Sequence, residues 1–120
     1  MKKILTALLL GTTLTMNAAV KIDKIEPTDW YVGLKDASLQ LMVYGEGIKT
    51  ADVTTDYPGA HIDSLVRLDS PNYLLVYMNL KGAQPGTMTL LFQQGKQKKK
   101  VNYTLKAREK KGYERDGFSN

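Results

Sequence analysis

Apolar residues recur at every second position along much of this chain, and this alternation constrains the fold more than any other feature. In an extended strand successive side chains point to opposite faces, so alternation gives one face to a core and the other to solvent. The apolar members of the four clearest runs are Leu39, Leu41 and Val43; Leu74, Val76, Met78 and Leu80; Met88, Leu90 and Phe92; and Val101, Tyr103 and Leu105. The pattern predicts half-buried β-strands and no long helix.

Short groups of turn-forming residues separate these runs, at positions 45–47, 57–59, 70–72 and 84–86, and residues 94–97 are expected to form a hairpin tip. With weaker strands at 21–25, at 51–55 and around Arg67, about seven strands result, which suits an antiparallel immunoglobulin-like β-sandwich. A small barrel is the alternative. We expect one shared core, made by Leu41, Val43, Val66, Leu74, Val76, Leu90, Phe92 and Tyr103.

The two ends of the chain differ from this β pattern. Lys2 and Lys3 precede an apolar run at 4–14 that is shorter than the ~20 residues needed to span a bilayer. Residues 1–19 are therefore predicted to be a signal peptide, and a buried core helix is the alternative. Residues 20–107 form the predicted domain, and the polar, glycine-punctuated residues 108–120 are expected to be a linker. The protein is thus expected to be exported, most simply to the periplasm.

Length and composition exclude several classes of protein. A chain of 120 residues provides one domain at most. The sequence contains no cysteine, which removes disulfides and zinc–thiolate sites from consideration. The formal net charge is +5, and cleavage after Ala18 would remove Lys2 and Lys3 and leave 15 basic against 12 acidic residues, or +3, which is too mild to indicate a nucleic-acid partner. The lysines at 96 and 98–100 are better explained as solubilising charges at a hairpin tip and strand edge, and no membrane partner is expected.

No group of residues predicts catalysis, a metal site or a cofactor. Glycoside hydrolysis requires two carboxyl groups held across a cleft, whereas Glu46, Asp52 and Asp56 lie at turns and strand edges. His61 is the only histidine, so any triad would have to use it, and its position at the start of a strand favours a structural role. A metal site built from His61, Asp63 and these aspartates is unspecific.

Trp30 and Tyr31 are the aromatic residues of greatest interest. An exposed flat ring can stack on a sugar, but a lone tryptophan in a small sandwich more often packs in the core or between domains. With Met42 and Tyr44 they form the candidate set for carbohydrate or interdomain contact.

An ordered series of short motifs runs from Glu26 to Arg108. It consists of Glu26-Pro27 with Trp30 and Gly33, residues 39–45, Pro58-Gly59, residues 70–74, residues 83–86, and Tyr103, Leu105 and Arg108. In this order the motifs resemble the N-terminal domain of cyclomaltodextrinases and neopullulanases, which are glycoside hydrolases of family thirteen, with the greatest likeness to periplasmic members from Bacteroides-type bacteria.

The resemblance implies a non-catalytic accessory domain, truncated before the catalytic barrel that hydrolyses α-1,4-glucosidic bonds in the parent enzyme. The truncation would reflect a short natural protein, a split gene or an incomplete record. The implied partners are that barrel, a second copy in a homodimer, and α-glucan. Two other classes stay open, a stand-alone α-glucan-binding module that uses Trp30 and Tyr31, and a purely structural or adhesive domain.

Overall fold

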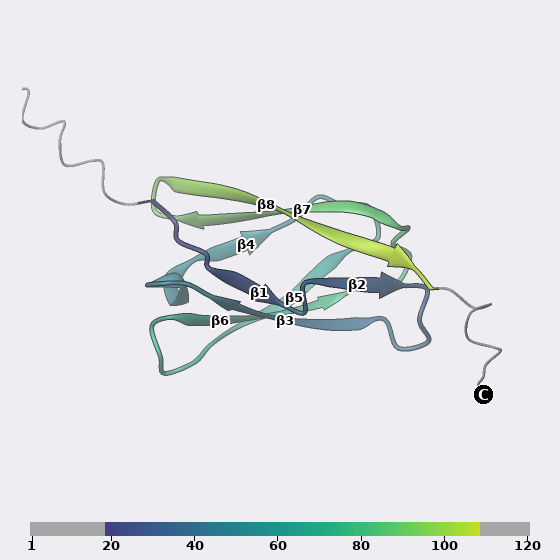
Figure 1. Cartoon of the computed structure of the whole chain (residues 1–120), viewed down its shortest axis with the longest axis horizontal. Coiled ribbons are helices and arrows are strands. Elements are labelled where there is room, and N and C mark those ends of the chain that lie inside the picture. The colour runs from purple at the N-terminus through teal and green to yellow at the C-terminus, as the bar shows by residue number, and fades with distance from the viewer. Residues whose placement is uncertain (1–18, 109–120) are drawn as a thin grey trace, which may run out of the picture.

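Two four-stranded β-sheets pack face to face in the computed structural model, which describes residues 19–108 (Figure 1). Sheet A has the strand order β1-β3-β6-β5, and sheet B has the order β2-β8-β7-β4. The elements are β1 (Lys24–Glu26), β2 (Asp29–Val32), β3 (Ser38–Tyr44), the 3₁₀ turn η1 (Ile48–Thr50), β4 (Asp52–Thr54), β5 (His61–Arg67), β6 (Tyr73–Asn79), β7 (Gly86–Gln94) and β8 (Gln97–Ala107). Most of the predicted signal peptide and linker lies outside the described residues.

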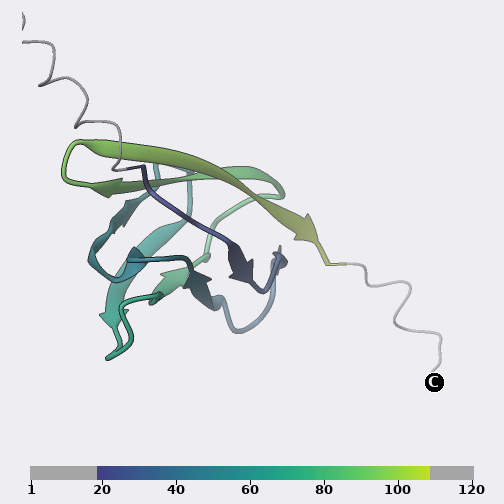
Figure 2. The same cartoon turned by 60° about the vertical axis from the view of Figure 1, so that its left-hand side comes forward.

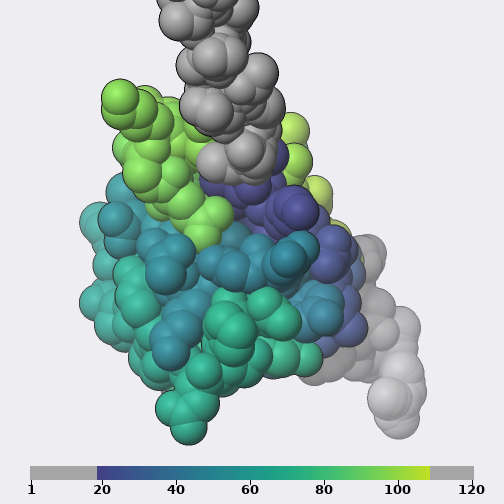
Figure 3. All heavy atoms as spheres, turned by 90° about the vertical axis from the view of Figure 1, so that its left-hand side faces the viewer, coloured from purple at the N-terminus to yellow at the C-terminus, as the bar shows by residue number. Residues whose placement is uncertain are grey.

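The topology is that of an immunoglobulin-like sandwich, as the sequence predicted. Strands β1, β3, β6 and β5 occupy the places of A, B, E and D, and β4, β7 and β8 those of C, F and G. Figures 1 and 2 show the long β7–β8 hairpin, which forms the centre of sheet B. Seen end-on, this hairpin (light green) and the turn near residue 70 (green) project from the two layers (Figure 3).

The first strand is divided between the two sheets, which gives eight strands rather than about seven. Strand β1 pairs antiparallel with β3, and the chain then crosses at the cis peptide bond Glu26-Pro27. Strand β2 then belongs to sheet B, where it pairs parallel with the end of β8. Tyr103 holds the crossing in place, because its hydroxyl donates a hydrogen bond of 2.8 Å to the carbonyl oxygen of Pro27. The sequence predicted neither β2 nor this parallel pair.

The core lies between the sheets and follows the predicted alternation. The inward residues of β3, β6, β7 and the end of β8 are almost fully buried, including Leu41, Val43, Leu74, Val76, Leu90, Phe92 and Tyr103.

The assignment of Val66 to this core was wrong, because its side chain is 38% exposed. A β-bulge between Ile62 and Ser64 changes the phase of β5. Leu65 therefore lies opposite the buried Val76, whereas Val66 lies opposite Leu75 on the outer face.

Candidate functional site

The acidic residues considered for catalysis are dispersed over the surface. The carboxylate of Asp52 accepts a hydrogen bond of 3.1 Å from Arg67, whose guanidinium also donates to the carbonyl oxygen of Ala51 at 2.8 Å. Glu46, at the end that η1 occupies, forms an exposed ion pair of 3.3 Å with Lys21. These carboxylates thus have partners that belong to the sandwich edge, and the structure does not bring them together in a cleft.

His61 begins the edge strand β5 and is exposed. Within residues 19–108, no three histidine, aspartate or glutamate side chains are grouped as ligands of a metal ion. The same residues contain no helix that is long and apolar enough to cross a membrane.

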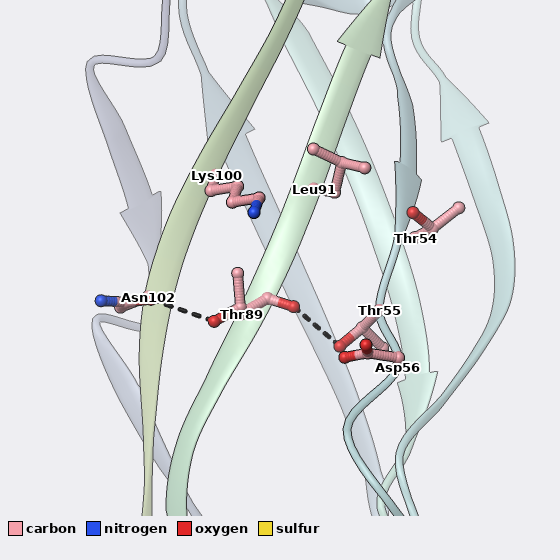
Figure 4. A pocket seen from close by; sticks show the side chains of 7 residues that line it. All are labelled: Thr54, Thr55, Asp56, Thr89, Leu91, Lys100 and Asn102. Atoms are coloured by element: carbon pink, nitrogen blue, oxygen red, sulfur yellow. Dashed lines mark hydrogen bonds between the residues drawn. The ribbon is translucent and has the colours of Figure 1, made fainter.

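A shallow polar hollow lies on the outer face of sheet B (Figure 4). Its lining residues come from β7, β8 and the segment that begins at β4, and they are Thr54, Thr55, Asp56, Thr89, Leu91, Lys100 and Asn102. The hydroxyl of Thr89 donates to Asn102 Oδ1 at 3.1 Å, and that of Thr55 donates to the carbonyl oxygen of Thr89 at 2.8 Å. The hollow has hydroxyl, amide and charged groups but no aromatic ring.

Sequence reasoning named Asp56 and Lys100 for other reasons and missed this hollow. The signal was present in the solvent-facing positions of the last two strands, where threonine, lysine and asparagine alternate with core residues. Which of these side chains share a hollow depends on the register, in which Thr89 lies opposite Asn102 and Leu91 opposite Lys100.

Trp30 and Tyr31 point to opposite faces of sheet B. Trp30 lies opposite the buried Leu105 and packs, half-buried, against the core. Tyr31 lies opposite Lys106 and is 40% exposed, with Lys106 Nζ 4.9 Å from the centre of its ring. Lys106 also forms an ion pair of 3.0 Å with Asp29, and the hydrogen bond to this carboxylate raises the pKa of Lys106 above its usual range.

Met42 and Tyr44 lie on a different surface, the outer face of sheet A. Met42 is opposite Leu75, and Tyr44 is opposite Tyr73, with 4.9 Å between the centres of the two tyrosine rings. The structure therefore distributes the four candidate contact residues over the outer face of sheet A, the outer face of sheet B and the core boundary. Their role in carbohydrate or interdomain contact stays a prediction.

These observations define the class of protein, an immunoglobulin-like β-sandwich module. The family model described as "Cyclomaltodextrinase, N-terminal" matches residues 24–109, and the chain belongs to this family. The match extends from the start of β1 to just beyond β8, so it covers both sheets. The resemblance stated from the ordered motifs is thereby confirmed, and the family is that of an accessory domain at the N-terminus of such enzymes.

Among solved structures, the chain is similar to "Structure of surface layer protein SbsC, domains 1-6". The two are 19% identical, with a TM-score of 0.47. The similarity covers 73% of this chain and 13% of that protein.

Proposed function

We propose that this chain is the non-catalytic N-terminal accessory domain of an exported cyclomaltodextrinase- or neopullulanase-like hydrolase. The family match over residues 24–109 is the observation that carries the proposal. In the parent enzyme a separate catalytic barrel, which follows Asn120, hydrolyses α-1,4-glucosidic bonds in cyclodextrins, pullulan or maltooligosaccharides. The domain packs on that barrel, shapes the access of substrate and assists dimerisation.

The surface chemistry of the described residues supports a non-catalytic role. A glycosidase needs two carboxyl groups about 5–9 Å apart on either side of the scissile bond. Of the acidic residues considered for catalysis, Asp52 is instead engaged with Arg67, Glu46 is engaged with Lys21, and Asp56 lies in an open hollow. The composition of residues 1–19 supports export, since a basic start precedes a short apolar run.

Two measurements test this function. The gene should encode a (β/α)₈ barrel after Asn120, and the resulting full-length polypeptide should release reducing sugar from cyclodextrin or pullulan. The 120-residue chain should release none under the same conditions. Hydrolysis by the 120-residue chain would contradict the accessory role, and unrelated sequence after Asn120 would contradict the assignment to a larger hydrolase.

A stand-alone α-glucan-binding module is the second candidate. One observation favours it: Tyr31 presents a partly exposed ring on the same face of sheet B as the polar hollow. Isothermal titration of the chain with maltoheptaose tests it, with Tyr31→Ala as the variant and Tyr77→Ala as the control. Tyr77 is a good control because it is similarly exposed, at 36%, but lies on the other sheet. Binding that Tyr31→Ala abolishes would favour this module.

A further inference from the structure

The outer face of sheet A carries an apolar patch. Six side chains form it, and we call them the outer patch: Met42, Tyr44, Val66, Tyr73, Leu75 and Tyr77. In the strand register Met42, Leu75 and Val66 form one row across three strands, and Tyr44 and Tyr73 form the next. Tyr77 extends the patch on the other side of Leu75, opposite Gln40 and Ser64.

The outer face of sheet B shows that such a patch is not a general property of this sandwich. Its outward positions on β7 and β8 are Thr87, Thr89, Leu91, Gln93, Lys98, Lys100, Asn102, Thr104 and Lys106. Among these, Leu91 alone is apolar. Because a solvated sheet face normally alternates polar with core residues, the outer patch indicates a covered surface on sheet A.

The composition of the outer patch is that of a protein–protein interface. Tyrosine and methionine are enriched at the centre of such interfaces, whereas lysine and glutamate are depleted there. Charged residues lie at one margin of the patch on β1, where Lys24 and Glu26 flank the patch strand β3 and form an exposed ion pair of 3.7 Å. The patch thus has an apolar centre and a polar rim.

The course of the chain brings a following domain within reach of the patch. Strand β8 ends at Ala107 beside Val32, at the end of the sandwich where β3 begins and β6 finishes. Tyr77 lies one row from that end, since the last pair of the ladder is Ser38 with Asn79. Residues 108–120, when extended, span about 40 Å, whereas packed sheets lie only about 10 Å apart. The outer face of sheet A is therefore within the reach of a domain that follows residue 120.

We propose that the outer patch is the docking surface for the catalytic barrel of the same polypeptide. This inference rests on the proposed function, because it takes the family's parent enzyme as the source of the barrel. It assigns the contact to sheet A and leaves the polar face of sheet B exposed.

Tyrosine nitration of the full-length polypeptide tests the assignment. The rate at which tetranitromethane nitrates Tyr77 is measured by peptide mass spectrometry, in the 120-residue chain and in the full-length polypeptide. We expect Tyr77 to react several-fold more slowly in the full-length polypeptide, because the barrel covers it.

Two variants make the test specific to one face. Leu75 and Leu91 are partly buried leucines in central strands, one on each outer face. Leu75→Arg should restore fast nitration of Tyr77 in the full-length polypeptide, and Leu91→Arg should not. Circular-dichroism melts of both variants in the 120-residue chain verify folding, and Met42→Gln, in the same row, replaces Leu75→Arg if that variant unfolds.

Other outcomes would overturn the proposal. Equal nitration rates in both polypeptides would exclude the outer patch as the docking surface, while hydrolysis of pullulan by the full-length polypeptide would leave the proposed function intact. Slow nitration already in the 120-residue chain, together with a dimer in sedimentation velocity, would identify a second copy as the occupant. A gene without a barrel after Asn120 would overturn both the inference and the proposed function.

Discussion

At the scale of single residues, two glycines show why the ordered motifs contain the residues they do. Gly59, in the Pro58-Gly59 motif, has a φ of +85°, and a Cβ atom there would lie 2.4 Å from the carbonyl carbon of Gly82. Gly33 has nearly the same φ, +83°, but a Cβ atom there would meet nothing within 4 Å. The two positions share a positive φ, which glycine adopts without strain, and differ in the space around them.

Replacing each glycine by alanine should separate these two causes. Gly33→Ala should lower the free energy of unfolding by about 1–2 kcal/mol, the cost of a left-handed conformation for a residue with a side chain. Gly59→Ala should cost about 3 kcal/mol or more, because the backbone of Gly82 must also move. Urea denaturation of the two variants measures the difference, and equal losses would show that the turn at Gly59 has room to relax.

Val76 is buried and Val66 is exposed, and single substitutions can test this difference in burial. Val76→Asp would bury an unpaired carboxylate in the core and should cost about 4 kcal/mol or more, a large part of the stability of a small domain. Val66→Asp, at a position 38% exposed, should change the stability little. Thermal melts followed by circular dichroism compare the two. A cooperative melt of Val76→Asp at the parent's temperature would contradict the core described above.

At the scale of strands, the sequence predicted those whose alternation is long and unbroken. Strands β3, β6, β7 and β8 have seven to eleven residues, and their apolar positions identified both the strand and its buried face. Strand β5 was assigned the wrong face, because one extra residue in a bulge reverses every side chain beyond it. Such a bulge has no marker in the local pattern around Arg67.

Neither the division of the first strand nor the candidate site could be predicted from the sequence, and the reasons are related. Strand β2 has only four residues, which is too short for alternation to be distinguished from chance. The pairing of β2 with β8 decides that Trp30 points inward and Tyr31 outward. The polar hollow and the outer patch likewise depend on which strands are neighbours, and alternation within a strand does not contain that information.

The hydrogen bond from Tyr103 to Pro27 connects the crossing between the sheets to β8. Its contribution to the stability of the folded state should depend on pH in the alkaline range. Burial, and to a lesser extent the charge of Asp29, raises the pKa of Tyr103 well above its ordinary value. The unfolded chain therefore loses the phenolic proton first, near pH 10, and the stability of the folded state decreases as the pH rises above that value.

Tyr103→Phe removes both the hydrogen bond and this titration. At pH 7 the variant should be less stable by about 1–2 kcal/mol, since it leaves the carbonyl oxygen of Pro27 without this donor. Between pH 9 and pH 11, about one unit on either side of the ordinary tyrosine pKa, its stability should decrease less steeply than that of the parent. Urea denaturation at a series of pH values provides the comparison. Parallel pH profiles for the two proteins would contradict the assigned role of the phenol.

At the scale of the whole molecule, the two outer faces of the sandwich differ in how they should interact with an apolar probe. The 120-residue chain should bind a fluorescent dye for exposed apolar surface, because the outer patch has no cover within the described residues. Leu75→Arg should reduce the fluorescence, and Leu91→Arg should leave it unchanged. Fluorescence titration of the folded proteins tests this, and an absence of dye binding by the parent chain would argue against an exposed interface.

The parallel pairing of β2 with β8 also has a mechanical consequence. The described chain enters at one end of the sandwich and leaves at the other (Figure 1). Tension applied between those ends pulls β2 and β8 in opposite directions along their common axis, so the ladder from Asp29–Thr104 to Val32–Ala107 is loaded in shear. In this geometry the hydrogen bonds share the force and must yield together, whereas a hairpin pulled from its open end releases them one at a time. The divided first strand therefore acts as a clamp against stretching.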